Sequence, residues 1–321
     1  MNGNTSHRIE EMEIEVEEND SDIAERQTLT SSVSEQPKVS KRFCCLRINF
    51  TRDEDSELHV QVVVQTLRLV AMSLYALMVV LSITLTKIFY GQFPQDNIIK
   101  KTFGANNICL YFDFPPTTYI MPPLWSLTCI VVALYCAASI YRYHVAWTEG
   151  KLSGILRKTL SIITLGYLCA TLVFSLCFAI QPKDHVHLIL HTLPFTHFIL
   201  WQILEQGSWV YFGFKYGWME MDEEGELYMP GIYKWISFGH WILQAFHGTI
   251  HVIYQLNGLM MTGGLLIEVT TPWFATLGEF SGYVYLFLAF ICPFLQSAYE
   301  SFKNKRSHKV LVVIKDNRKS C

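Results

Sequence analysis

Histidines are concentrated in two apolar segments of this sequence. Residues 185–197 read HVHLILHTLPFTH, and residues 238–251 read FGHWILQAFHGTIH. The two segments together hold seven of the eleven histidines in the chain. Imidazole groups ligate transition metals, relay protons, or act as bases near neutral pH. Which of these uses applies depends on the helices that carry the side chains.

Helical spacing places these side chains on two stripes. Residues four, seven and eleven apart share one face of an α-helix. In the later segment, one face carries His240, Gln244, His247 and His251. In the earlier segment and its continuation, one face carries His187, His191, Gln202 and Glu205. Such groups face the interior of a membrane helix bundle, because lipid would leave them without hydrogen-bond partners.

The depth of each side chain follows from the rise of about 1.5 Å per residue along antiparallel helices. The predicted outer layer contains His187, His191, His247 and His251, and the predicted inner layer contains Glu205 and His240. Hydrogen bonds that only hold helices together are the simplest use of such residues. That use explains one or two histidines more easily than six on facing stripes.

Composition predicts the class of protein. The 321 residues are 51% hydrophobic and only 17% charged, which is low in charge for a soluble protein. Six apolar segments are long enough to cross about 30 Å of hydrocarbon. Their extents are 62–88, 119–141, 158–180, 186–214, 233–258 and 279–299. Residues 260–278 are interrupted by Glu268 and Pro272 and are interpreted as an interfacial or re-entrant loop. We therefore predict an all-α, multi-pass membrane helix bundle of about six transmembrane helices.

Charges outside the segments predict orientation and domains. Lysine and arginine cluster before the first segment, between the second and third, and after the sixth, so both termini are expected in the cytoplasm. Arg142 belongs to the loop cluster, and Arg68 lies near enough to the start of its segment to reach the headgroups. Residues 1–57 form a predicted disordered acidic tail, 58–300 the transmembrane domain and 301–321 a basic tail.

Composition also limits the partners. The chain has no basic patch with interleaved aromatic residues, so nucleic acid is not expected as a partner, whereas membrane lipids are. Cys44 and Cys45 lie beside cationic residues shortly before the first segment, a pattern that suits S-palmitoylation. The alternative is that they are two idle thiols. The sequence identifies neither protein partners nor the organelle of this integral membrane protein.

A catalytic use of the histidines requires a hydroxyl nucleophile at the same depth. The second segment, PPLWSLTCIVVAL, supplies Thr128, and HLILHTLPFTHFILWQILE follows two segments later. These motifs resemble the androgen-induced and androgen-dependent family of six-span membrane hydrolases. The resemblance implies hydrolysis of fatty acid esters, with Thr128 as nucleophile and His191 as the functional histidine. We expect no cofactor for this activity, and the resemblance covers roughly residues 60–300.

Other uses stay open. Four imidazoles could hold zinc, copper or haem between His187, His191, His247 and His251. The two layers could instead conduct or sense protons, in which case Glu205 and His240 are required. A receptor or structural membrane protein would need none of this chemistry. Ester hydrolysis needs nothing from Glu205, so that residue distinguishes the hydrolase from the conductor.

Overall fold

The computed structural model describes residues 39–43, 46–50, 57–91, 98–104, 110–148, 150–182, 184–217, 231–262, 272–303 and 309–315. The chain divides into two compact units. One comprises Met1–Val64 together with Arg306–Cys321, and the other comprises Gln65–Lys305. Cys44 and Cys45, the predicted lipidation sites, lie outside the described residues.

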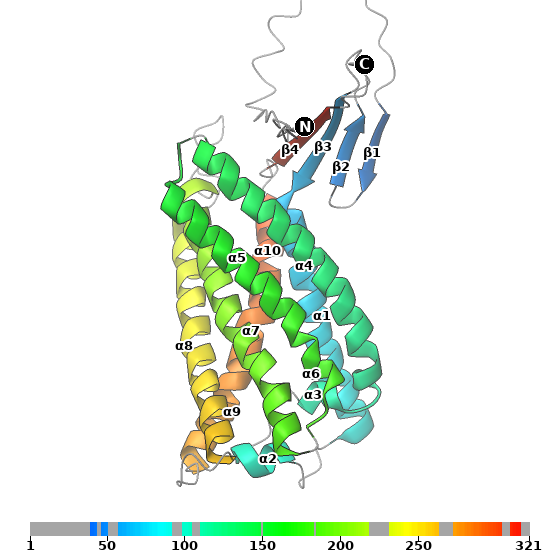
Figure 1. Ribbon diagram of the computed structural model, residues 1–321, viewed down its shortest axis with the longest axis vertical. Helices are drawn as coiled ribbons and strands as arrows, with labels where there is room; N and C mark the ends of the chain where they lie inside the picture. Colours follow the sequence, from blue (N-terminus) through cyan, green and yellow to red (C-terminus); the bar gives the residue numbers. More distant parts are fainter. Residues whose placement is uncertain are drawn as a thin grey trace, which may run out of the picture. The chain divides into compact units, whose positions relative to one another are not determined.

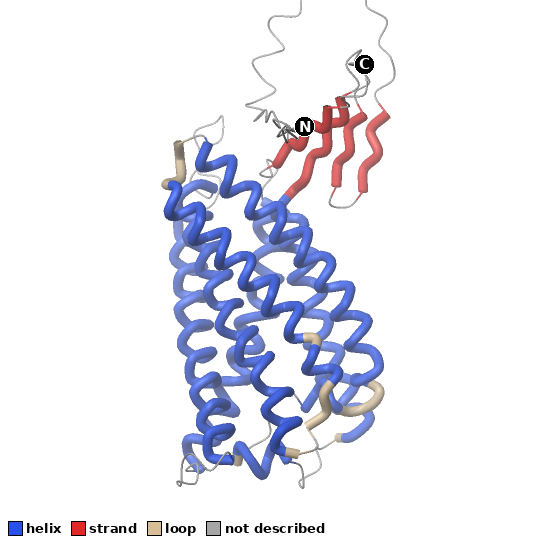
Figure 2. Tube along the Cα trace, in the orientation of Figure 1, coloured by secondary structure: helices blue, strands red, loops and turns tan. Residues whose placement is uncertain are grey.

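The first unit contains a four-stranded antiparallel sheet that the sequence analysis did not predict (Figure 2). Its strands pair in chain order and are β1 (Val39–Phe43), β2 (Leu46–Phe50), β3 (Glu57–Val63) and β4 (Lys309–Lys315). The two predicted tails thus share one sheet, with Val60 opposite Val312. The prediction of a wholly disordered segment 1–57 is therefore wrong for β1 and β2. Valine-rich β3 and β4 favour extended structure, but among the described strands β4 pairs only with β3, a strand about 250 residues away.

The second unit is helical (Figure 1). Its α-helices are α1 (Val64–Tyr90), α2 (Ile98–Phe103), α3 (Leu110–Asp113), α4 (Thr117–Thr148), α5 (Gly154–Phe174), α6 (Leu176–Ala179), α7 (His185–Phe212), α8 (Gly231–Thr262), α9 (Pro272–Leu286) and α10 (Cys292–Lys303). Two π-helical turns, η1 (Gly213–Gly217) and η2 (Phe287–Ile291), follow α7 and α9. The all-α prediction holds for this unit.

Four stretches of the described chain are long and apolar enough to cross a membrane. They are Val64–Tyr90, Thr117–Thr148, Gly154–Ala179 and Trp273–Ser301. The predicted fourth and fifth spans correspond to α7 and α8, which have 28 and 32 residues but carry the polar stripes that lower their hydropathy. The fold is compatible with a multi-pass membrane protein, while six crossings and cytoplasmic termini stay predictions.

The predicted loop 260–278 is shorter than expected. Helix α8 continues to Thr262 and α9 already begins at Pro272, which leaves only residues 263–271 between the two helices. The sequence analysis interprets Pro272 as a helix breaker. It stands instead at the first position of α9, where the missing N–H of proline costs nothing.

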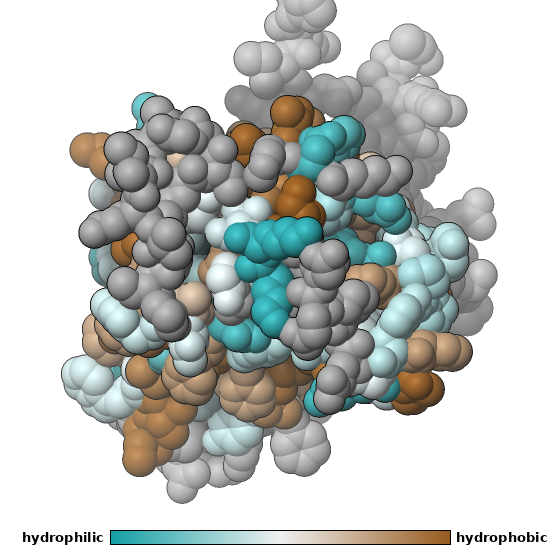
Figure 3. Space-filling model, turned by 90° about the horizontal axis from the view of Figure 1, so that it is seen from below, coloured by the Kyte–Doolittle hydropathy of each residue, from teal (hydrophilic) through white to brown (hydrophobic). Residues whose placement is uncertain are grey.

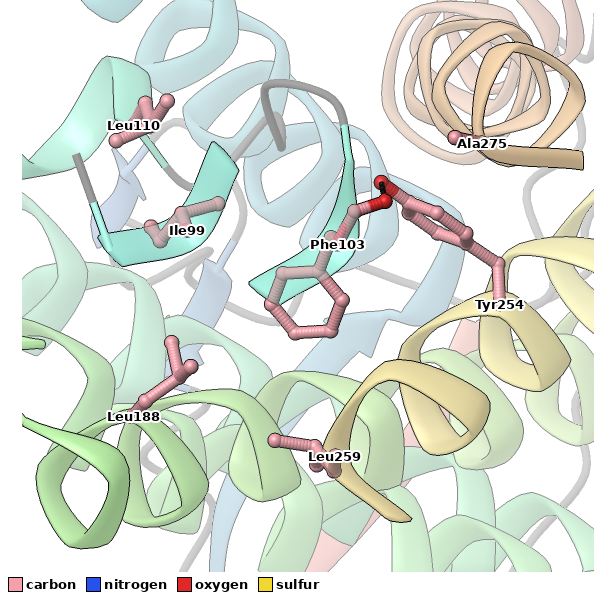
Figure 4. Close-up of a cluster of buried hydrophobic side chains, with 7 residues drawn as sticks. All are labelled: Ile99, Phe103, Leu110, Leu188, Tyr254, Leu259 and Ala275. Carbon is pink, nitrogen blue, oxygen red and sulfur yellow. Dashed lines mark hydrogen bonds between the residues drawn. The ribbon is translucent and has the colours of Figure 1, made fainter. Parts of the chain in front are cut away.

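One end of the helical unit is closed by the short helices α2 and α3 (Figure 1). Figure 4 shows their side chains packed against the ends of α7, α8 and α9 in a cluster of buried apolar residues. The members are Ile99, Phe103, Leu110, Leu188, Tyr254, Leu259 and Ala275. The Tyr254 hydroxyl also donates to the Phe103 carbonyl at 3.0 Å. The same end of the molecule, seen in Figure 3, gathers hydrophilic residues across its middle and apolar residues toward its margin. Because Leu110 of α3 is held in this buried cluster, the position of Asp113 at the end of the same helix is also restricted.

Candidate functional site

The four histidines of the predicted outer layer differ in burial and in partners. His191 and His251 are buried, at 2% and 0% exposure. His187 is 49% exposed and pairs at 2.8 Å with Asp184, the N-cap residue of α7. His247 is only partly buried and lies 3.4 Å from the Ser281 hydroxyl. Within the described ranges no three His, Cys, Asp or Glu side chains form a group suited to a metal ion.

Three of the interior histidines donate to main-chain carbonyl groups. His191 Nδ1 donates to Ile180 at 2.8 Å, and His251 Nδ1 donates to Gly278 at 3.0 Å. His240 Nε2 donates to Leu288 at 2.7 Å. A carbonyl oxygen only accepts, so the bonded ring nitrogen carries the proton and the other nitrogen of a neutral ring is a free base.

His240 has a structural role at the π-helical turn η2. Pro293 has no N–H to donate to Ala289, four residues earlier, and the chain widens to a π-turn just before it. Gln202 Nε2 donates to the freed Ala289 carbonyl at 2.9 Å, and His240 donates to the neighbouring Leu288. Both side chains therefore satisfy backbone groups that lipid would leave unpaired. His240 has no hydrogen bond to Glu205 among the described residues, although the neighbouring Trp241 donates to the Ile203 carbonyl on α7 at 3.0 Å. The shared inner layer of His240 and Glu205 stays a prediction.

His251 belongs to a fully bonded chain of polar groups. Gln255 Nε2 donates to His251 Nε2 at 3.1 Å, and the Thr196 hydroxyl donates to Gln255 Oε1 at 2.7 Å. This chain ties α7 to α8, as predicted for polar groups that hold helices together.

Substitution at Gly282 is expected to destabilise the protein by about 1–3 kcal/mol, because the imidazole of His251 cannot move away. A Cβ at Gly282 would lie 2.6 Å from His251 Cε1. Gly239, also helical, has nothing within 4 Å of the position that a Cβ would take and is the matched control. Thermal unfolding in detergent measures the change in stability of each variant, Gly282→Ala and Gly239→Ala. Gly239→Ala is expected to be neutral or slightly stabilising, and equal effects would contradict the steric argument.

Asp113 faces the free nitrogen of His191. The distance from Asp113 Oδ2 to His191 Nε2 is 3.7 Å, within ion-pair range but too long for a hydrogen bond. Both atoms are buried and have no hydrogen-bond partner among the described residues. Burial raises the pKa of the Asp113 carboxyl to about 6, although the charge of His191 lowers it. We call these two residues the Asp113–His191 pair, and its arrangement suits the binding of a proton.

Asp113 is expected to make stability depend on pH. Its folded pKa of about 6 is above the ordinary 3.8, so its stabilising contribution is complete below pH 3.8 and is lost as pH rises through 6. The shift of about two units corresponds to about 3 kcal/mol at most. Asp113→Asn should therefore be more stable than wild type at pH 8 and equal to it near pH 4. Unfolding curves at both pH values test this, and a pH-independent difference would contradict it.

Thr128 is not placed beside His191. It is fully buried on α4, and its hydroxyl donates to the Leu124 carbonyl at 2.9 Å, with Met78 Sδ at 3.8 Å. A hydroxyl bonded to its own helix is the ordinary state of threonine in a membrane helix. One turn away, the Trp125 ring packs against Phe174 and Phe178 at centroid distances of 4.4 and 5.6 Å. In the described contacts, Asp113 occupies the position beside His191 that was expected for Thr128.

Four buried charges form a second site, which we call the charged cluster. Its members are Arg68, Arg142, Glu205 and Glu300, at 0%, 8%, 2% and 1% exposure. They come from α1, α4, α7 and α10. In Figure 1 these parts of the four helices lie toward the end opposite α3. Four ionisable groups buried in a membrane bundle are costly, and such groups are candidates for a functional site.

Arg68 is the best-bonded member of the charged cluster. Its Nη1 donates to Ser297 at 2.6 Å, and its Nη2 donates to Gln206 at 2.7 Å. Glu300 Oε2 lies 3.9 Å from Nη1. Glu300 Oε1 accepts from the Tyr233 hydroxyl at 2.7 Å and from Trp209 Nε1 at 3.3 Å. The guanidinium thus joins α1, α7 and α10 and is fully buried inside the protein, whereas the prediction expected it to extend outward to the headgroups.

Glu205 is held at one oxygen only. The Tyr135 hydroxyl donates to its Oε1, while Oε2 is buried and has no donor among the described residues. Arg68 and Arg142 both attract it electrostatically. Farther along the bundle, both polar atoms of the fully buried Gln244 lack a partner within the described ranges. Glu205 therefore has a free, buried site for a proton.

Besides Arg68, three residues of the two sites were missed from the sequence or were given another role. Arg142 was counted only for orientation, and Glu300 and Asp113 were not singled out. Spacing could have indicated Glu300, because Gln296 and Glu300 are four residues apart near the end of an apolar segment. Asp113 stands in a four-residue helix, which has no periodicity to reveal its direction.

No family model, curated protein or solved structure matches this chain. The resemblance to the six-span hydrolases is therefore neither supported nor opposed by these comparisons.

Proposed function

We propose that this protein is a multi-pass membrane protein that conducts protons. The observation that carries the proposal is that Asp113 Oδ2 and Glu205 Oε2 are buried without a hydrogen-bond donor among the described residues, as is Glu300 Oε2, which belongs to the same charged cluster as Glu205. Asp113 and Glu205 belong to the two ends of one helical unit, in α3 and in the late part of α7. A proton acceptor at each end is what a proton path requires.

Energetics supports this reading over a purely structural one. A buried polar group without a partner costs about 1–3 kcal/mol, and more when it is charged. Residues that only hold helices together are bonded, as Gln202, Gln255 and His251 are. The free carboxyl oxygens of Asp113 and Glu205 can instead bind a passing proton and then release it to the next acceptor.

The side chains between the two ends include groups able to pass a proton. The Tyr285 hydroxyl donates to Gln202 Oε1 at 2.5 Å, and Gln202 lies one turn before Glu205 on α7. Gln244 lies nearby on α8, with its amide unpartnered among the described residues. Two buried phenylalanines, Phe195 and Phe198, lie between Gln202 and His191 along α7. Conduction therefore requires water to enter between these rings.

Ester hydrolysis by Thr128 and His191 stays a prediction from the resemblance. The free His191 Nε2 suits a general base. The Thr128 hydroxyl, however, donates to the Leu124 carbonyl rather than to a side chain that could act as its general base. Hydrolysis also leaves the charged cluster without a use, so the contacts favour conduction. A receptor or structural role leaves both free carboxyl oxygens without a use.

Proton flux into liposomes tests the proposal. Protein reconstituted with an internal pH dye, under a potassium diffusion potential set by valinomycin, is expected to acidify the lumen several-fold faster than protein-free liposomes. Flux equal to that of protein-free liposomes, with correctly folded protein present, would reject proton conduction.

A further inference from the structure

Arg142 differs from Arg68 in having an open edge. Its Nε and Nη2 are buried and have no acceptor among the described residues, whereas both Nη atoms of Arg68 are bonded. Leaving one buried charge without its partner costs several kcal/mol, about 3–5 when a pair is broken. The Nε–Nη2 edge of a guanidinium is also the edge that binds a carboxylate through two parallel hydrogen bonds.

The surroundings of Arg142 hold that edge in place. Its guanidinium carbon lies 4.2 Å from the Phe212 ring centroid and 5.0 Å from that of Trp209. One turn earlier on α4, the fully buried Ser139 hydroxyl also has no partner within the described ranges. The aromatic rings restrict the rotation of the guanidinium, and the hydroxyl adds a further donor. The group is thereby prepared for an oxyanion attached to an apolar or flat body.

Charge balance selects a monoanion. The two arginines and two glutamates of the charged cluster sum to zero, and Glu205 and Glu300 both interact electrostatically with Arg142. A bound monoanion leaves one excess negative charge, which a single proton on Glu205 Oε2 neutralises. A dianion such as a phosphate ester would require two protons, or a buried net charge.

We propose that Arg142, with Ser139, forms a binding site for a monocarboxylate with a flat or apolar body, and that Glu205 takes up a proton when the site fills. The site is separate from the Asp113–His191 pair. It does not rest on proton conduction, because binding requires no gradient across a membrane.

Benzoate, benzamide and phenyl phosphate are the probes. They share a ring and differ in charge, so calorimetry on the full chain in nanodiscs separates the oxyanion from the ring. Benzoate is expected to bind at least tenfold more tightly than benzamide and than phenyl phosphate. In two buffers of different ionisation enthalpy, uptake of about one proton per benzoate is expected, and uptake should disappear in Glu205→Gln.

Two variants test the residue. Arg142→Met is expected to abolish benzoate binding, and Arg142→Lys, which keeps the charge and loses the fork, to weaken it at least tenfold. Arg157→Met is the control, because Arg157 lies 4.1 Å over the Trp147 ring, is partly exposed, contacts His144 and does not belong to the charged cluster. If Arg142→Met does not fold, the benzoate affinity of Arg142→Lys tests the proposal by itself. Absence of benzoate binding to wild type, equal binding of benzamide, tighter binding of phenyl phosphate, or affinity within twofold in Arg142→Lys would each overturn the proposal.

Discussion

Replacing Glu205 with glutamine is expected to lower proton flux in liposomes at least tenfold. The side chain of glutamine has the same shape and keeps the acceptor for the Tyr135 hydroxyl, but its amide does not bind and release a proton near neutral pH. The loss should therefore come from the chemistry at Oε2 rather than from unfolding. The internal pH dye measures the rate directly.

The matched control is Glu279→Gln. Glu279 is a partly buried acid on α9, outside the charged cluster, and the same chemical change there should leave flux within twofold of wild type. Equal losses in the two variants would point to a general effect of removing acids. Full flux in Glu205→Gln would remove Glu205 from the path.

The same variant separates conduction from hydrolysis. A fluorophosphonate probe labels activated hydroxyl nucleophiles, so labelling of wild type that disappears in Thr128→Ala and His191→Ala would support the predicted hydrolase. That labelling should persist in Glu205→Gln, since ester hydrolysis does not use this residue. If Glu205→Gln is still labelled by the probe but has lost proton flux, the two sites act independently.

The helices and part of the interior could be predicted because their signals are local. Hydropathy located the apolar helices, and the spacing of four placed His251 and Gln244 inside the bundle. The sheet could not be predicted this way, because β3 pairs with β4 across almost the whole chain. Helical periodicity also gives a direction but no partner, which is why His191 was expected beside Thr128 and lies beside Asp113.

The charges were harder to place because the rules for charge at membrane ends are averages. Arg68 and Arg142 both fit the pattern of cations near the ends of spans, and that pattern predicts exposure at the headgroups. Their burial depends on acids from distant helices, Glu205 and Glu300, which neutralise them. Only the packing of four helices brings these opposite charges together.

Arg68→Met is expected to destabilise the protein by about 3–5 kcal/mol, because removing one member of a buried ion pair leaves the other charge unpaired. Gln206 and Ser297 would each lose a donor, and Glu300 would lose its ion-pair partner. Arg157→Met removes a guanidinium that lies over a tryptophan at almost the same distance, 4.1 Å against 4.2 Å, but at a partly exposed position. Arg157→Met should lower the free energy of unfolding by less than about 1 kcal/mol. Unfolding in mixed micelles by added dodecyl sulfate compares the two variants.

The double variant Arg68→Met with Glu300→Gln tells why the single variant is unstable. If the cost comes from the unpaired Glu300 carboxylate, neutralising that carboxylate should restore part of the lost stability, although it removes a second native side chain. The glutamine oxygen can still accept from Tyr233 and Trp209, so the remaining contacts of position 300 are kept. If the double variant is instead less stable than Arg68→Met, the guanidinium acts through its hydrogen bonds to Gln206 and Ser297, and the charge of Glu300 has another partner. Arg142 is the nearest candidate, since it also attracts Glu300.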